Sequence, residues 1–342
     1  MKFITSYFRR NSFDIPFLGK DTIGDVIMRP LSESTPVVLD VGARNGMMML
    51  PESYAQRSHL LGLEPNETEY KKLIDSDTDA HKVGADIPKF KIETYLPYAL
   101  WNKVEERNLD ITIGPGACTM MGDTIKRVTS NMVMDMKTIK GQSFEELHAK
   151  VLRKEKVNCT SLDAISNQNK INKIDFLKLD CEGAELNCLL GADSLLSRQK
   201  VLMVYSEFVA LRYYNDHATL ADQLKFLEER GYRLIALDLG HEGYQWKSHK
   251  LSSDKDRRLL HAGDYWACVD PDKIDLTPED MQRLAALSII FGFNSLGLNL
   301  LSEAGYNSIK EINRIADLLS SAVTFKRIKR AWQKFPDTIR GL

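Results

Sequence analysis

Short apolar runs recur through the middle of the chain, and most are followed by segments with helical periodicity. The runs that we interpret as strands are residues 37–41, 59–63, 92–100, 174–179, 201–205, 232–237 and 265–269. Such alternation is typical of a mostly parallel sheet with helices on both faces. The pattern therefore predicts a seven-stranded α/β fold.

Two helical segments between these runs end in glycine. Residues 184–190 and 220–230 carry leucines on one face and precede Gly191 and Gly231. Glycine is common where a helix ends. Both segments are predicted to be helices that pack against the sheet.

One stretch departs from the alternation, between about residues 103 and 158. Within it, residues 109–113 are predicted to form part of a hairpin, and the charged residues 144–156 a helix. We interpret this stretch as an insertion that covers the site. It lies within a main domain of residues 37–275, which follows a lead-in of residues 1–36.

The last part of the chain, residues 276–342, is predicted to be a helical extension. Thr277 and Pro278 form a helix start, with Thr as N-cap and Pro in the first turn. Residues 284–301 carry no charge, but their Gly, Ser and Asn content favours two short buried helices joined near Asn294 over a membrane span.

The basic segment of residues 325–332 is compatible with peripheral contact to anionic lipid. A solvated helix face, or a contact between subunits of a homo-oligomer, is the favoured interpretation.

Charge and cysteine content restrict the partners and the compartment. The chain has 46 Lys and Arg against 47 Asp and Glu, so it lacks the broad basic surface that nucleic acid requires. Its five cysteines lack the paired spacing of a zinc or redox motif, and residues 1–14 lack the apolar core of a secretory signal. We expect a cytoplasmic protein with reduced thiols that does not bind nucleic acid.

The first predicted strand runs directly into a glycine turn, which reads DVGARNG from Asp40 to Gly46. Glycine allows a ligand to approach the backbone closely. A dinucleotide site needs G-x-G-x-x-G, because its pyrophosphate lies on a helix N-terminus, and the spacing here fits that need poorly. S-adenosylmethionine carries no phosphate, and its amino acid end suits Asp40 and backbone amides near Gly42, Ala43 and Gly46.

Glu64 directly follows the second predicted strand, beside this turn. A carboxylate at that position can accept hydrogen bonds from both hydroxyls of a ribose. The same geometry serves NAD(P), so a nucleotide-cofactor oxidoreductase stays open as an alternative.

Longer sequence motifs help to decide between these two cofactors. They read DVGARNG at 40–46, LEPNETEYKKL at 63–73, TSLDAI at 160–165, KIDFLKLDCEGAE at 173–185 and LGA at 190–192. In this order, across about residues 37–270, they resemble the FkbM family of methyltransferases.

The resemblance implies a class I methyltransferase fold, S-adenosylmethionine as methyl donor, and a hydroxyl acceptor on a sugar, a glycan or another natural product. It assigns Asp40, Gly42 and Gly46 to the methionine end and Glu64 to the ribose. Asn102, where the family usually has Asp, is a candidate for the adenine. Arg44 stands where Asn is more usual.

Candidates for the reacting centre follow the later strands, because ligands of open α/β sheets lie outside the carboxyl ends of the strands. Asp180 and Glu182 follow the fourth strand, next to the expected methyl, and Asp180 is also a candidate cofactor contact. His241 closes the sixth strand, and Asp180, Glu182 and His241 are the candidates for a base that removes the acceptor proton.

Glu207 and Tyr213 are candidates for acceptor binding, although a structural hydrogen bond and packing are the competing roles. Asp180 and Glu182 could also hold a divalent metal or cap the following helix; we expect no metal. A non-catalytic module that binds S-adenosylmethionine is a further alternative.

Overall fold

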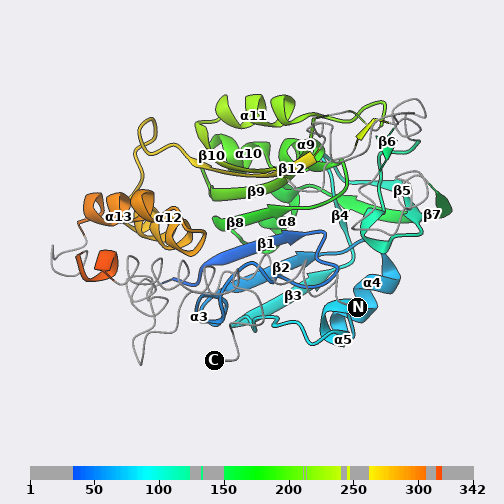
Figure 1. The fold of residues 1–342 in the computed structure, drawn as a ribbon, viewed down its shortest axis with the longest axis horizontal. Helices are drawn as coiled ribbons and strands as arrows, with labels where there is room; N and C mark the ends of the chain where they lie inside the picture. Colours follow the sequence, from blue (N-terminus) through cyan, green and yellow to red (C-terminus); the bar gives the residue numbers. More distant parts are fainter. Residues whose placement is uncertain are drawn as a thin grey trace, which may run out of the picture.

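A seven-stranded sheet forms the centre of the computed structural model, which describes residues 34–123, 132–133, 150–210, 212, 214–239, 245–246, 262–305 and 313–317 (Figure 1). Its strand order is β10-β12-β9-β8-β1-β2-β3. The strands are β1 (Val37–Val41), β2 (His59–Leu63), β3 (Ile92–Leu96), β8 (Ile174–Leu179), β9 (Val201–Val209), β10 (Tyr232–Leu239) and β12 (Ala262–Val269). β12 pairs antiparallel with β9 and β10, while β3, β2, β1, β8 and β9 pair in parallel. The predicted mostly parallel α/β sheet is confirmed.

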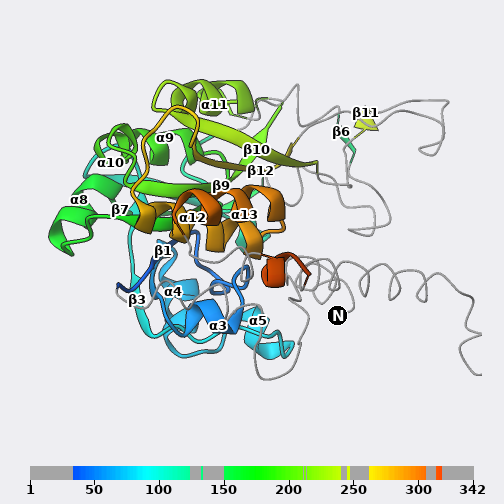
Figure 2. The ribbon, with the colours of Figure 1, turned by 90° about the vertical axis from the view of Figure 1, so that its left-hand side faces the viewer.

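Helices pack around this sheet. They are α3 (Glu52–Ala55), α4 (Glu67–Ile74), α5 (Asp79–Lys82), α8 (Leu162–Gln168), α9 (Glu185–Leu190), α10 (Asp193–Ser197), α11 (Leu220–Glu228), α12 (Pro278–Ile290) and α13 (Asn294–Glu303). Figure 1 shows α12 and α13 at the left of the sheet, and the parallel strands, such as β1 and β2, point to the right. Seen from that left-hand side, α12 and α13 lie in front of the strands (Figure 2).

The insertion forms a small sheet at the edge where the parallel strands end. Its strands are β4 (Ala99–Leu100), β7 (Val151–Thr160) and β5 (Glu105–Thr112), in the order β4-β7-β5. Residues 109–112 therefore lie in an antiparallel strand, but their partner β7 comes from the far end of the insertion and not from across a hairpin turn. The predicted strand 92–100 is divided around Pro97, because β3 joins the large sheet and β4 the small one.

The predicted helix 144–156 is wrong where the structure describes it, because residues from Val151 onward belong to β7. Pairs of opposite charge across the two strands, such as Lys156 with Glu106, replace the helical contacts that the charge pattern suggested. Residues 144–149 lie outside the described residues.

The two helix-ending glycines serve different purposes. Gly231 has a φ of +80°, which is the left-handed conformation expected where a helix ends. Gly191 has a φ of −73°, and a Cβ there would lie 2.0 Å from the carbonyl oxygen of Trp101. Gly191 is therefore needed for the close approach of the segment after β4, not for its backbone freedom.

The start of the C-terminal extension folds as predicted. The Thr277 side chain accepts a hydrogen bond from the Asp280 amide at 3.2 Å, with Pro278 in the first turn. α12 and α13 are two short helices, and α13 begins at Asn294. No helix among the described residues is long and apolar enough to cross a membrane. The basic segment 325–332 lies outside those residues.

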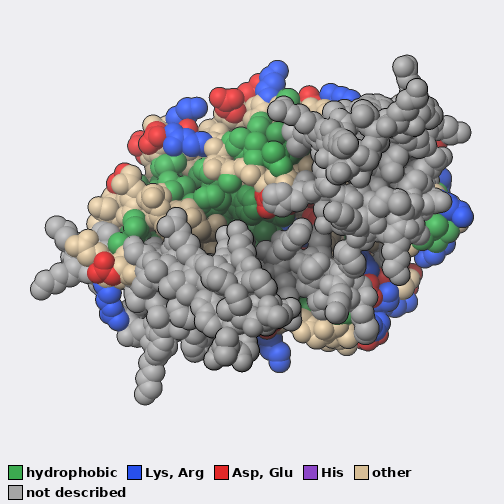
Figure 3. Space-filling model, viewed as in Figure 1, with side chains coloured by type: hydrophobic (Ala, Val, Ile, Leu, Met, Phe, Trp, Pro, Cys, Tyr) green, Lys and Arg blue, Asp and Glu red, His purple; other side chains and the backbone are tan. Residues whose placement is uncertain are grey.

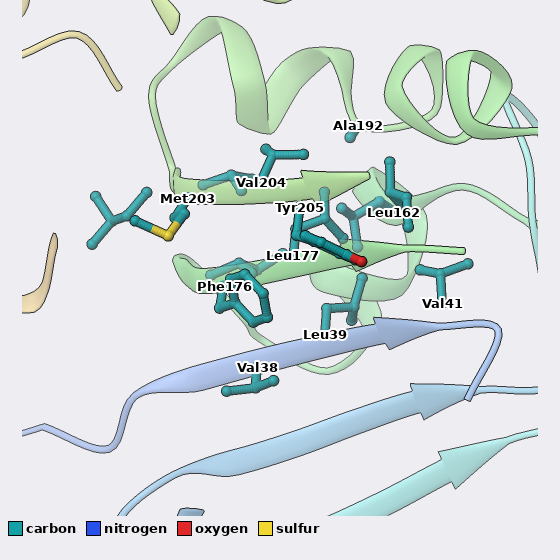
Figure 4. Packing of buried hydrophobic residues seen from close by; sticks show 14 of the residues in the cluster. Val38, Leu39, Val41, Leu162, Phe176, Leu177, Ala192, Met203, Val204 and Tyr205 are labelled. Carbon is teal, nitrogen blue, oxygen red and sulfur yellow. The ribbon is translucent and has the colours of Figure 1, made fainter. Parts of the chain in front are cut away.

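α12 is part of the main hydrophobic core. Its Leu284, Leu287 and Ile290 are buried in the same cluster as the strands. Just beyond its end, the Phe291 ring lies 4.9 Å from that of Phe176 in β8, centroid to centroid. Figure 4 shows the centre of this core, with Phe176 and Leu177 of β8 between side chains of β1 and β9.

A buried ion pair fixes α12 to the sheet. Arg283 Nη1 lies 2.8 and 2.9 Å from the two carboxylate oxygens of Asp175, which is fully buried at the start of β8. Asp175 also accepts a hydrogen bond from the Val37 amide at 2.7 Å. One carboxylate therefore joins β8, β1 and α12.

Apolar side chains also gather on the outer surface, over the part of the sheet that contains β10 (Figure 3). Leu234, Leu237 and Leu239 of this strand are 38%, 45% and 47% exposed. β10 is the last strand in the order of the large sheet. Exposed apolar residues on an edge strand are typical of surfaces that contact other segments or chains.

We expect Arg283→Met to lower the free energy of unfolding by about 3–5 kcal/mol, because the buried Asp175 carboxylate would lose its cation. Chemical denaturation measures this change. Lys71→Met is the matched control, since Lys71 is 67% exposed in its pair with Glu67 and its loss should leave stability almost unchanged. Equal effects of the two substitutions would contradict the prediction.

Candidate functional site

Three parallel strands end side by side at one edge of the sheet. β1 lies between β2 and β8, and Asp40 is paired in register with Gly62 on one side and Lys178 on the other. The chain leaves β1 toward β2 in one direction and β8 leads to β9 in the other. Such a reversal of strand order marks the crevice where open α/β sheets bind ligands.

The glycine turn after β1 closes this edge. Gly42 has a φ of +79°, and a Cβ there would lie 2.0 Å from the Asp180 carbonyl oxygen. The amides of Gly42 and Ala43 both donate to the Leu63 carbonyl, at 3.1 and 3.0 Å. Gly46 has a φ of +81° and donates from its amide to the Ala43 carbonyl. The turn therefore joins the ends of β1, β2 and β8.

Asp40 has one carboxylate oxygen bonded and one without a partner. Its Oδ1 lies 3.0 Å from Lys178 Nζ, and it is 1% exposed. Its buried Oδ2 and the buried Oδ1 of Asn45 have no hydrogen-bond partner. Burial raises the pKa of Asp40, while Lys178 lowers it. Two unsatisfied acceptors at one turn fit a donor group such as the ammonium of an amino acid.

Glu64 lies beside them at the end of β2. It is 6% exposed and accepts a hydrogen bond from the Asn66 amide at 2.9 Å. Burial raises its pKa to about 7. A carboxyl at this position fits the two hydroxyl donors of a ribose.

Arg44, whose effect on the turn the sequence did not reveal, connects the turn to α4 and α5. Its Nε lies 2.9 Å from Glu69 in α4, and its Nη2 contacts Asp79 in α5. Its charge also lowers the pKa of Glu64 against the effect of burial. Arg44 therefore fixes the turn from the side of β2.

Acidic side chains from three elements lie close enough to affect one another at the same edge. Burial raises the pKa of Glu182, Glu207 and Asp264, and the charge of Asp180 raises all three further. Asp264 is paired in register with Glu207, because β12 runs antiparallel and begins where β9 ends. The structure thus brings together three predicted residues, Asp180, Glu182 and Glu207, and adds Asp264.

Neither Asp180 nor Glu182 caps α9, whose N-cap residue is Ala184 and has no side-chain cap hydrogen bond; the acid that binds the turn before the helix is Glu185. α9 begins at Glu185, whose Oε1 accepts hydrogen bonds from the amides of Cys181 and Gly183 at 3.1 and 3.2 Å. Glu182 has a φ of +50°, a strained conformation for this residue type, and its carbonyl accepts from the Thr119 hydroxyl at 2.8 Å. Strain of this kind is common at functional sites.

Other predicted residues do not join this group in the described part of the chain. The exposed Asn102 donates to Asn187 in α9, and its assignment to the adenine stays a prediction. His241 and Tyr213 lie outside the described residues. Among the residues that the structure does describe, no group of three or more His, Cys, Asp or Glu could hold a metal ion.

Sequence reasoning missed two residues of the site, Lys178 and Asp264. Lys178 is a charged residue inside the buried strand IDFLKL, which was a usable signal. Its Nζ lies 3.0 Å from Asp40 and 3.1 Å from Asp180. Asp264 gave no comparable signal, because its place depends on the register of an antiparallel strand.

We expect Gly42→Ala to destabilise the fold more than Gly84→Ala does. Both glycines have a positive φ, but a Cβ at position 84 meets nothing within 4 Å, whereas one at 42 meets the Asp180 carbonyl. The control should lose about 1–2 kcal/mol from backbone strain alone, and Gly42→Ala clearly more. Thermal and chemical unfolding of the two variants measure the difference, and equal losses would contradict the prediction.

The sequence of this chain matches one known protein family. The model of the methyltransferase FkbM domain matches residues 40–234, which is more than half of the chain. No curated protein matches the sequence.

Among solved structures, similarity is distant. Magnesium protoporphyrin IX methyltransferase from Synechocystis PCC 6803 with bound SAM has 12% identity and a TM-score of 0.31, covering 77% of this chain and 90% of its own. Precorrin-6y C5,15-methyltransferase from Geobacter metallireducens GS-15 has 12% identity and a TM-score of 0.29, covering 75% and 94%. At such scores the substrates of these proteins carry no information about this chain.

The family match covers the turn after β1, Glu64, Lys178, Asp180 and Glu207, and it argues against the oxidoreductase alternative. The chain belongs to the FkbM methyltransferase family and is an S-adenosylmethionine-dependent methyltransferase.

Proposed function

We propose that this enzyme transfers a methyl group to a hydroxyl on a sugar, a glycan or another natural product. The observation that carries the proposal is the group of acids Asp180, Glu182, Glu207 and Asp264, which lies at the sheet edge beside Asp40. Carboxylates accept hydrogen bonds from hydroxyl donors, and a sugar offers several donors on a small surface. The family's common acceptors support the same choice.

The residues at the glycine turn fit the cofactor. The unpartnered Asp40 Oδ2 and Asn45 Oδ1 would hold the ammonium of S-adenosylmethionine, and Glu64 its ribose hydroxyls. When bound, this cofactor supplies a methyl group on a positively charged sulfur. The protein's tasks are then to align the acceptor oxygen and to exclude water.

Asp264 and Glu207 are suited to remove the acceptor proton. They face each other in register, and burial with the nearby charge of Asp180 raises the pKa of Asp264 to about 7. A base is most effective when its pKa lies near the working pH. We propose that this pair takes the proton as the hydroxyl oxygen is methylated, and that Asp180 and Glu182 orient the acceptor.

We expect S-adenosylhomocysteine, the product form of the cofactor, to raise the thermal stability of the protein, and NADH to leave it unchanged. A ligand at one hundred times its Kd adds about 2.7 kcal/mol. Glu64→Ala should abolish most of the shift, while Glu67→Ala, in the exposed first turn of α4, should retain it. A shift with NADH alone would overturn the assignment of the cofactor.

We expect the methylation rate to fall as the pH is lowered through about 7, because Asp264 must be ionised to accept a proton and its pKa lies there. Formation of S-adenosylhomocysteine over a panel of methyl glycosides and hydroxylated natural products measures the rate. Asp264→Asn should lose turnover but keep the thermal shift with S-adenosylhomocysteine. Methylation only of amines or carboxylates would exclude the proposed hydroxyl acceptor.

A further inference from the structure

Lys178 contacts carboxylates on both sides of the site. It lies in β8, directly beside Asp40 of β1 and Tyr205 of β9 in the register of the sheet. Its Nζ is 3.0 Å from Asp40 Oδ1 and 3.1 Å from Asp180 Oδ2. One buried ammonium group therefore joins a carboxylate of the glycine turn to one of the acceptor group.

This lysine stays charged although only 13% of its side chain is exposed. Burial lowers its pKa, but Asp180 and Asp40 together raise it above the ordinary value. Its charge also lowers the pKa of Asp264. A buried ammonium carries a desolvation penalty that an apolar side chain of similar length would avoid. Packing alone therefore does not explain a lysine at this position.

The geometry at Asp40 shows what the lysine leaves available. Lys178 occupies Oδ1, while the buried Oδ2 has no partner. The carboxylate is therefore held in one orientation, with one oxygen left to accept a hydrogen bond from a ligand. Asp180, 33% exposed, is held by the same ammonium at the end of β8.

We propose that Lys178 is a positioning residue that binds Asp40 and Asp180 at once, so that the strength of cofactor binding depends on the charge of the acceptor-side carboxylate. The inference rests on the proposed function, because it assigns Asp40 to the cofactor and Asp180 to the acceptor side. It goes beyond it by making the two subsites one electrostatic unit.

Removal of the ammonium leaves Asp40 and Asp180 as two unpaired acids that repel each other. Lys178→Met should weaken the binding of S-adenosylhomocysteine by about tenfold or more, because Asp40 would then be largely protonated and free to rotate. Lys178→Arg should bind within a few-fold of the wild type, since it restores the charge.

The direction in which Asp180→Asn changes ligand affinity distinguishes a positioning role of Lys178 from a packing role. With Lys178 present, Asp180→Asn should weaken binding. Lys178 then pairs with Asp40 alone and neutralises more of its negative charge, so that Asp40 attracts a ligand less strongly. With Met at position 178, Asp180→Asn should strengthen binding, because it removes the repulsion. Isothermal titration calorimetry of S-adenosylhomocysteine with the four proteins of this cycle measures both effects.

Lys173→Met is the matched control. Lys173 lies just before the other end of β8 and pairs with Asp280, so its loss also removes an ion pair at this strand but should not change ligand affinity. Should Lys178→Met fail to fold, Lys178→Gln, which keeps a hydrogen-bond donor without the charge, replaces it in the cycle.

Wild-type affinity in Lys178→Met, or an effect of Asp180→Asn with the same sign and size in both backgrounds, would overturn the positioning role while leaving the proposed function intact. Failure of the wild-type protein to bind S-adenosylhomocysteine would overturn the proposed function and this inference with it.

Discussion

The site depends on how closely two backbone segments approach at the carboxyl edge of the sheet. Gly42 lies against the Asp180 carbonyl so closely that a Cβ has no room, and the amides of Gly42 and Ala43 bond to the end of β2. Because the ends of β1, β2 and β8 are joined in this way, Asp40, Glu64 and Asp180 have fixed relative positions. A ligand that binds at the turn therefore meets carboxylates whose positions the backbone fixes.

The central strand β8 carries buried charges at both ends, and they have different roles. At its start, Asp175 binds Arg283 with both oxygens and also accepts from the Val37 amide, so its acceptors are used within the fold. Near its end, Lys178 joins two carboxylates, but Asp40 keeps an oxygen without a partner. A buried carboxylate whose two oxygens are both bonded within the fold serves packing, as in Asp175, while one with a free oxygen, as in Asp40, has capacity for a ligand.

Much of the architecture could be predicted because it depends on local pattern. β1, β2 and β8 have the predicted bounds, and Thr277 caps α12 as expected. The helix predicted for residues 144–156 failed because the charges of β7 are paired across a neighbouring strand, which periodicity along one segment does not show. The sequence also did not predict that α12 belongs to the main core, because its buried contact with β8 joins residues about a hundred positions apart in the chain.

In the site, too, residues within local motifs could be predicted, while those placed by long-range strand pairing could not. Asp40 lies near the end of β1, Gly42, Glu64 and Asp180 directly follow strands, and all four belong to recognisable strings that the structure places at one edge. Asp264 reaches the site only because β12 runs antiparallel beside β9, and register of that kind is decided by the whole sheet. Neither Asp180 nor Glu182 caps α9; Glu185 instead stabilises the turn before it, because its side chain accepts hydrogen bonds from two amides of that turn.

The acids at this edge outnumber the cations that pair with them: Lys178 pairs with Asp40 and Asp180, while Glu182, Glu207 and Asp264 lie half-buried nearby. Burial and mutual repulsion raise the pKa of Glu182, Glu207 and Asp264, so the fold bears the cost of holding them close together. A ligand that brings positive charge lowers that cost, whereas a neutral one does not. The cofactor carries positive charge on its sulfur before methyl transfer and loses it afterwards. The acidic edge should therefore bind the positively charged substrate form of the cofactor more tightly than the product form. The repulsion among the acids, which the sulfonium charge relieves, returns after methyl transfer and favours product release.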